Sequence, residues 1–246
     1  MTSAVYTIWL RNWKRYIRSK SRMIGSLVQP LLFFLSLGFG LGSAVSSGGD
    51  YMKFIAPGVI AMSVLFTSVF SGIQIIWDKQ FGFLKETLVA PISRIKIMIG
   101  QTLGGATSAL IQGFFMLIFT FLISGLSINL GIFIAILFMI LIGLAFTSMG
   151  LAIASRMEDM QGFQLITNFV VMPIFFLSGA LYPITNLPAV LKDIVYLDPL
   201  TYGVEGMRYG LLGTSTINPI LSLLVIGGFT VIMISLGGYL FNKTKV

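Results

Sequence analysis

The sequence predicts an all-helical polytopic membrane protein with six transmembrane helices, on three observations. Apolar residues make up 56% of the chain, charged residues only 10%, and the mean hydropathy is +0.95. Six apolar stretches each approach the roughly 20 residues that a helix needs to cross a bilayer. The segments that connect the spans fall alternately on the two sides of the membrane, and most lysine and arginine residues then lie on one side. This composition excludes an ordinary soluble globular protein.

Residues 3–20 predict an amphipathic helix that lies in the membrane interface. One side carries apolar and aromatic residues at helical spacing, and the opposite side is basic. The apolar side consists of Val5, Ile8, Trp9, Trp13, Tyr16 and Ile17, and the basic side of Arg11, Lys14, Arg15 and Arg18. The alternative is the start of a cleaved signal peptide. The apolar run that follows is as long as a full span, which disfavours that alternative.

Six transmembrane spans follow, and within their expected bounds none contains Asp, Glu, Lys or Arg. They are expected at about 24–44, 55–77, 97–124, 130–154, 163–182 and 218–241. Pro30 and Pro173 fall inside spans and should bend them. Gly100 and Gly104 form a Gly-x-x-x-Gly pair, which suits close helix packing.

The distribution of basic residues predicts that both termini are cytoplasmic. With the N-terminus inside, the arm before the first span, residues 78–96, residues 155–162 and the C-terminal tail share one side of the membrane. Of the 16 Lys and Arg residues, only Lys53, Lys192 and Arg208 then lie on the other side. The acidic residues divide evenly, so the bias is the positive-inside pattern. The net charge of +8 is therefore attributed to membrane topology, and nucleic acid is not expected as a partner.

The cytoplasmic segment 78–96 is a charged stretch between two spans, and its middle, 82–90, predicts a short amphipathic helix. Phe83, Thr87 and Leu88 share one face, and Lys85 and Glu86 point to the other. Pro91 disfavours helix geometry in the residue before it, and Ser93 is placed to cap the next helix. Such a helix offers a contact for a soluble partner; the alternative is an ordinary polar loop.

Residues 183–217 on the other side predict two helical stretches separated by Asp198 and Pro199. Residues 189–197 place Val190, Ile194 and Leu197 on one side, with Lys192 opposite. Residues 200–212 are mixed in character and carry tyrosines suited to an interface. The segment is expected either to lie on the outer surface or to dip back into the membrane where protein covers its backbone.

The sequence offers no recognisable constellation of catalytic residues, so the chain is not expected to be an enzyme. It lacks both cysteine and histidine, which removes thiol nucleophiles, the usual metal ligands and the usual general base. No Gly-x-x-x-x-Gly-Lys-Ser/Thr motif is present, so ATP is not expected to bind to this chain. Glu158 and Asp159 are adjacent carboxylates, interpreted as solvated turn residues and not as a metal site.

Two stretches resemble the permeases of type-2 ATP-binding-cassette exporters (the ABC-2 family). The first, around Glu86, Leu88, Pro91, Ser93 and Arg94, resembles the turn of that family between spans two and three. The second resembles the family pattern between spans five and six. It comprises Ser178-Gly179, Tyr182-Pro183, Asn186-Leu187-Pro188, Asp198-Pro199-Leu200-Thr201-Tyr202, Arg208 and the closing Leu211-Leu212-Gly213. Many members have Asn where Asp198 stands, a mild departure.

The resemblance implies a single ABC-2 membrane domain over residues 1–246, located in the plasma or inner membrane. It implies two permease chains, expected as a homodimer, and two copies of a cassette ATPase that holds ATP and magnesium; no cofactor is expected on this chain. The ATPase-coupling residues would be Phe83, Leu84, Lys85, Glu86, Thr87, Leu88, Pro91, Ser93 and Arg94.

The resemblance also places spans one, two and five around the substrate pathway. Among the polar and aromatic residues of those spans it favours Gln29, Asn168, Phe175 and Phe176, although each could simply pack against a neighbouring helix. The expected activity is outward transport of a hydrophobic or amphipathic drug, antibiotic or lipid. A lipid-linked glycan is the alternative within the family. An ion-coupled transporter would need ionisable groups inside its spans, and a non-transporting scaffold would leave segment 78–96 unexplained.

Overall fold

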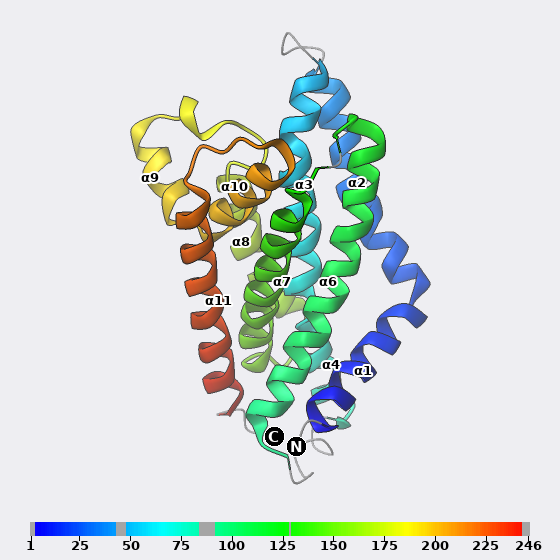
Figure 1. Ribbon diagram of the computed structural model, residues 1–246. Coiled ribbons are helices and arrows are strands. Elements are labelled where there is room, and N and C mark those ends of the chain that lie inside the picture. The colour runs from blue at the N-terminus through cyan, green and yellow to red at the C-terminus, as the bar shows by residue number, and fades with distance from the viewer. Residues whose placement is uncertain (1–2, 43–47, 84–91, 128, 243–246) are drawn as a thin grey trace.

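The computed structural model describes residues 3–42, 48–83, 92–127 and 129–242, and in these ranges every regular element is a helix (Figure 1). The helices are α1 (Ser3–Arg18), α2 (Lys20–Gly42), α3 (Gly48–Phe70), α4 (Ile73–Gln80), α6 (Arg94–Ser124), α7 (Ile132–Ser155), α8 (Met160–Leu177), the 3-10 helix η1 (Ile184–Asn186), α9 (Ala189–Leu197), α10 (Pro199–Leu212) and α11 (Pro219–Asn242). This confirms the predicted fold class.

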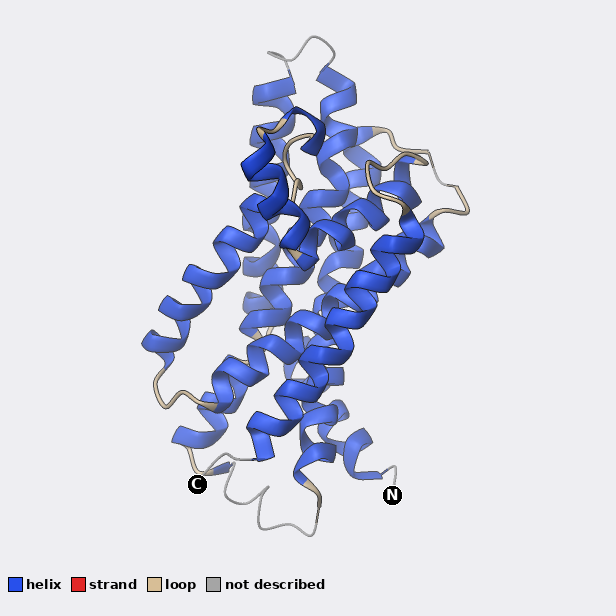
Figure 2. Ribbon diagram, turned by 90° about the vertical axis from the view of Figure 1, so that its left-hand side faces the viewer, coloured by secondary structure: helices blue, strands red, loops and turns tan. Residues whose placement is uncertain are grey.

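Six helical segments are long and apolar enough to cross a membrane, and they run side by side between two ends (Figure 2). They are Met23–Gly42, Tyr51–Gln80, Arg94–Ser124, Ile132–Ser155, Met160–Leu177 and Pro219–Asn242. Helix α1 begins and α11 ends at the same end of the bundle, which we call the terminal end (Figure 1). The even number of spans requires this arrangement.

The expected bounds of two spans need correction. The fifth ends at Leu177 and not at residue 182, because the chain turns at Gly179, whose φ of 68° is left-handed. The second begins earlier and continues to Gln80, so its helices include Lys53, Asp78 and Lys79, although the sequence interpretation kept charge out of the span. A hydropathy pattern ends a span at its first charges, whereas the helix continues past them.

The second span is interrupted where α3 meets α4, at a close backbone approach to α7. A Cβ atom on Gly72 would lie 2.5 Å from the carbonyl oxygen of Gly150, and a Cβ on Gly150 would lie 2.3 Å from that of Val69. Only glycine fits both positions without moving the backbone. The pair therefore lets the junction of α3 and α4 pack tightly against the last turns of α7, just before the polar residues of α4.

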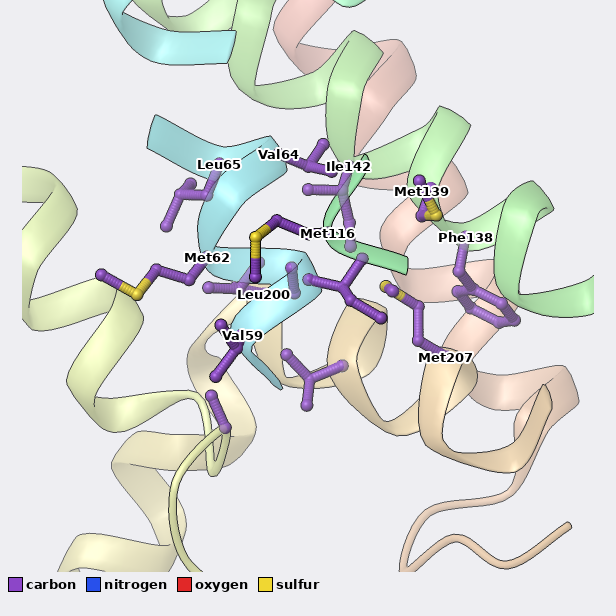
Figure 3. Close-up of a cluster of buried hydrophobic side chains, with 14 of the residues drawn as sticks. Val59, Met62, Val64, Leu65, Met116, Phe138, Met139, Ile142, Leu200 and Met207 are labelled. Carbon is purple, nitrogen blue, oxygen red and sulfur yellow. The ribbon is translucent and has the colours of Figure 1, made fainter. Parts of the chain in front are cut away.

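The main hydrophobic core lies around α3, which is the most buried span. Figure 3 shows its side chains gathered with those of α6, α7 and α10, including Val59, Leu65, Met116 and Ile142. Because α10 supplies Leu200 and Met207 to this cluster, the segment between spans five and six is part of the core.

Helices α9 and α10 lie in the half of the molecule opposite the terminal end (Figure 1). Their bounds, Ala189–Leu197 and Pro199–Leu212, confirm the two helical stretches predicted from the sequence. Most of α10 is buried against α3, α7 and α11, whereas α9 keeps Val190 and Leu197 exposed. The segment is thus inserted into the bundle through α10 and is not a surface loop.

Candidate functional site

The predicted ATPase-coupling segment is described only at its two flanks. Leu84, Lys85, Glu86, Thr87, Leu88 and Pro91 lie outside the described residues. On the near side α4 ends at Gln80 and is followed by Phe83, which is half exposed. On the far side Ser93 occupies the N-cap position of α6, as predicted, but its side chain makes no capping hydrogen bond. The described flanks nevertheless show how this segment is fastened to the bundle.

Asp78 connects the near flank to α1. Asp78 is buried, and its carboxylate accepts hydrogen bonds from Nη2 of Arg11 at 2.8 Å and from Nε2 of Gln74 at 3.0 Å. Nη1 of Arg15 forms a second ion pair with it at 3.6 Å. A buried carboxylate is stable only with such partners, so this set of contacts fixes α1 against α4.

Lys79 connects the same flank to α7. Its ammonium group donates to the carbonyl oxygens of Ser155 at 2.7 Å, Met157 at 3.1 Å and Ala154 at 3.4 Å. The last carbonyls of a helix have no partner within it, and a cation there also complements the helix dipole. The neighbouring Gln80 donates to the carbonyl oxygen of Glu158 at 3.0 Å. The near flank is therefore fixed to the turn between α7 and α8.

Arg94 connects the far flank to α11. Its Nη1 donates to the carbonyl oxygen of Asn242, the last residue of α11, at 2.7 Å. We define the coupling junction as Asp78, Lys79, Gln80 and Arg94 together with these partners. Through it the two flanks of the segment contact α1, α7, the α7–α8 turn and α11, so a displacement of the segment would act on four parts of the bundle.

Helix α1 packs along the terminal half of α6. Gly100 and Gly104 form the contact surface, since a Cβ atom on them would meet Ile8 and Asn12 at 2.9 Å and 2.6 Å. Polar bonds add to this contact: Asn12 donates to Gln101, Trp9 to Thr107, and Tyr16 to Gln112 at 3.0 Å. The Gly-x-x-x-Gly prediction is confirmed.

The four predicted pathway residues do not form one cluster. Phe175 is buried in the core, with its ring 6.3 Å from that of Phe33 on α2 and 6.2 Å from that of Phe66 on α3. Phe176 is its ring neighbour but is 47% exposed. Gln29, on α2, is exposed and lines a separate hollow between α2 and α3.

Asn168 lies on an open face of α8, together with two further amides. Gln161, Gln164 and Asn168 are all exposed, and their spacing of three and four residues places them along one stripe of the helix. Amide groups are costly to leave in hydrocarbon, so this stripe is expected to face water or another protein chain.

The sequence interpretation missed a buried ion pair in the segment between spans five and six. Arg208 donates through Nη1 to Glu205 and through Nη2 to the carbonyl oxygen of Gly179 at 3.0 Å. Its guanidinium carbon lies 4.1 Å from the ring centroid of Phe54. Glu205, which is fully buried, also accepts from the backbone of Thr216. The pair therefore links α10 to α3, to the turn after α8 and to the chain before α11.

Asp198 marks the start of α10. One of its carboxylate oxygens accepts from the backbone nitrogen of Leu200 at 2.9 Å, and the other has no partner within the described residues. Burial raises the pKa of this carboxyl to about 7, against the lowering effect of the Leu200 bond. Asp159 has a simpler cap role at α8, where it accepts from the backbone nitrogen of Gly162. No metal-binding cluster occurs in the described part of the chain.

Comparison with known proteins agrees with the family resemblance found in the sequence, along most of the chain. Residues 3–212 match the family model for the ABC-2 type transporter. The inner membrane transport permease YadH of Escherichia coli (strain K12) is 28% identical over 221 residues, covering 87% of this chain and 85% of the relative. Nodulation protein J of Rhizobium leguminosarum bv. viciae is 28% identical over 219 residues, covering 85% and 84%. The chain belongs to the ABC-2 type transporter family.

Proposed function

We propose that this chain is the membrane-spanning subunit of an exporter powered by a separate cassette ATPase. The terminal end faces the cytoplasm, where the segment around residues 82–90 contacts the ATPase. ATP and magnesium are bound by that partner and not by this chain. The coupling junction carries the proposal, because both flanks of the contact segment are fixed to helices of the bundle. Such connections are needed to convert a push on the segment into helix movement.

We further propose that the substrate is hydrophobic or amphipathic, such as a drug, an antibiotic or a lipid. The described spans carry few charges, and these lie at or near helix ends. The transported molecule would therefore meet apolar and amide side chains. Gln29, Asn168 and Phe176 stand on exposed surfaces and remain candidate contacts.

The amide stripe of α8 supports a second permease chain. In the monomer Gln161, Gln164 and Asn168 would face lipid. A second copy of this chain would cover them or enclose a hydrated pathway beside them, so the working unit is proposed to hold two permeases and two ATPases.

Reconstitution tests the function directly. The purified permease and its ATPase in vesicles should move a fluorescent amphipathic substrate only when ATP is hydrolysed, and a hydrolysis-deficient ATPase is the control. Transport driven by an ion gradient without ATP would contradict the proposal. Transport of a lipid-linked glycan but not of the amphipathic probe would retain the ATP-driven exporter and replace the substrate class.

A further inference from the structure

The elbow between α1 and α2 concentrates positive charge on one exposed surface. Arg18 ends α1, Ser19 separates the helices, and Lys20 begins α2. Together with Lys14 and Arg15 these residues line a shallow hollow on the outside of the bundle. We call Lys14, Arg18 and Lys20 the elbow cations.

The elbow cations lack counter-charges within the described chain. Arg11 and Arg15, on the same helix, are paired with Asp78. Lys14, Arg18 and Lys20 are exposed, and they make no hydrogen bond or ion pair with any described residue. The ion pairs of Asp78 are with Arg11 and Arg15, and none is formed with Lys14, Arg18 or Lys20.

The elbow also lies beside an apolar part of the bundle. Tyr16, in the last turn of α1, donates to Gln112, which is 18 residues along α6 from Arg94. The apolar run of α6 begins at Ile97, well before that contact. On the other side of the elbow, α2 enters its own apolar span at Met23. Uncompensated cations at such a position are costly, and their long side chains usually extend to the interface and pair there.

We propose that the elbow cations bind the phosphate groups of anionic phospholipids in the leaflet that contacts the terminal end. Three flexible cations around a shallow hollow fit several phosphate oxygens, and an anionic leaflet attracts basic residues next to a membrane span. The lipid supplies the counter-charge that the described chain does not. This inference requires only that the chain spans a membrane and is independent of ATP-driven export.

The tryptophans provide an intrinsic probe of this site. The chain has three, Trp9 and Trp13 on α1 and Trp77 on α4, and all lie in helices of the terminal half. The full-length protein is reconstituted in vesicles of zwitterionic lipid containing a fixed share of brominated phosphatidylglycerol or of brominated phosphatidylcholine. We expect stronger tryptophan quenching by the brominated anionic lipid, and a loss of the difference at high salt, which screens exposed charges.

The double variant Arg18→Gln, Lys20→Gln should lose the preference for the anionic lipid. The control variant Lys53→Gln, Lys192→Gln removes the same amount of charge far from the elbow, and should keep the preference for the anionic lipid. A second control, Arg18→Lys, Lys20→Arg, changes the same two positions but preserves their charges, and should also keep the preference for the anionic lipid. It shows whether a loss of preference comes from the lost charges or from misfolding. Equal quenching by the two lipids in the wild type, or a preference that survives in the Arg18→Gln, Lys20→Gln variant, overturns the proposal.

Discussion

The Asp78 carboxylate lies 2.8 Å from Nη2 of Arg11, although the two residues are 67 positions apart. This ion pair joins the first helix of the chain to the helix that leads into the proposed ATPase contact. It is also nearly buried on the Asp78 side, where the side chain is 3% exposed, against 35% for Arg11. The pair is thus both a structural contact and the proposed route by which movement of the segment reaches α1.

Substitution Asp78→Asn tests this pair. The amide keeps the size of the side chain but removes the charge, leaving Arg11 unpaired and presenting it with a competing donor. We expect a loss of about 2 kcal/mol of stability, measured by thermal unfolding in detergent, because hydrogen bonds to charged groups are worth about 1.5–3 kcal/mol. The matched control Asp193→Asn changes an exposed carboxylate and should be neutral. Equal stability of the two variants would contradict the assignment.

Substitution Lys79→Met tests the bond to the end of α7. Methionine preserves much of the side-chain volume but leaves the carbonyls of Ser155 and Met157 without their donor. We expect faster amide hydrogen exchange in residues 152–160 than in the wild type, measured by mass spectrometry. Lys192→Met, on α9, is the control. Unchanged exchange in residues 152–160 would show that Lys79 does not hold this turn.

Substitution Arg208→Met tests the ion pair of α10. It leaves the Glu205 carboxylate buried without its cation, and breaking a buried pair in this way typically costs about 3–5 kcal/mol. The double variant Glu205→Gln, Arg208→Met removes both charges and should recover part of the loss. A double-mutant cycle on thermal stability gives the coupling energy. Additive effects of the two single variants would exclude a coupled pair.

Asp198 predicts a pH dependence of stability. Its pKa in the folded protein is about 7, raised from 3.8, so the folded state holds a proton that the unfolded state releases. The contribution of Asp198 to the free energy of unfolding is therefore fully present below about pH 4. It is lost as the pH rises towards 7, and the free energy of unfolding falls by at most about 4 kcal/mol. Asp198→Asn should remove this component. Parallel pH profiles of unfolding for the wild type and the variant would contradict it.

The sequence predicted the helices well where a single periodic pattern decides the structure. Helix α9 has the predicted bounds because its apolar residues, including Val190 and Ile194, recur at helical spacing between Pro188 and Asp198. Close helix packing at Gly100 and Gly104 was likewise predicted from a local pair of glycines, although their partner helix α1 was not. Such features depend on neighbours along the chain.

The coupling junction was not predicted, because its bonds join residues far apart in sequence. Nothing local to Asp78 or Lys79 indicates that one will meet Arg11 and the other the end of α7. Both residues were placed in the charged cytoplasmic segment 78–96, since charge normally marks the end of a span. The spacing of Glu205 and Arg208, three residues apart on one helix, was a signal that could have revealed their ion pair.

The predicted helix 82–90 is proposed to transmit ATP-driven movement to the bundle, and Glu86→Ala and Leu88→Asp test this most directly. Glu86 is the proposed charged contact with the ATPase, and Leu88 belongs to the predicted apolar face; both lie outside the described residues. The measurement is the number of substrate molecules exported per ATP hydrolysed in vesicles, with Lys53→Ala as the control. The account predicts that both variants insert normally but export less per ATP or lose the ATPase on purification. Wild-type export per ATP with full ATPase binding in both variants would contradict it.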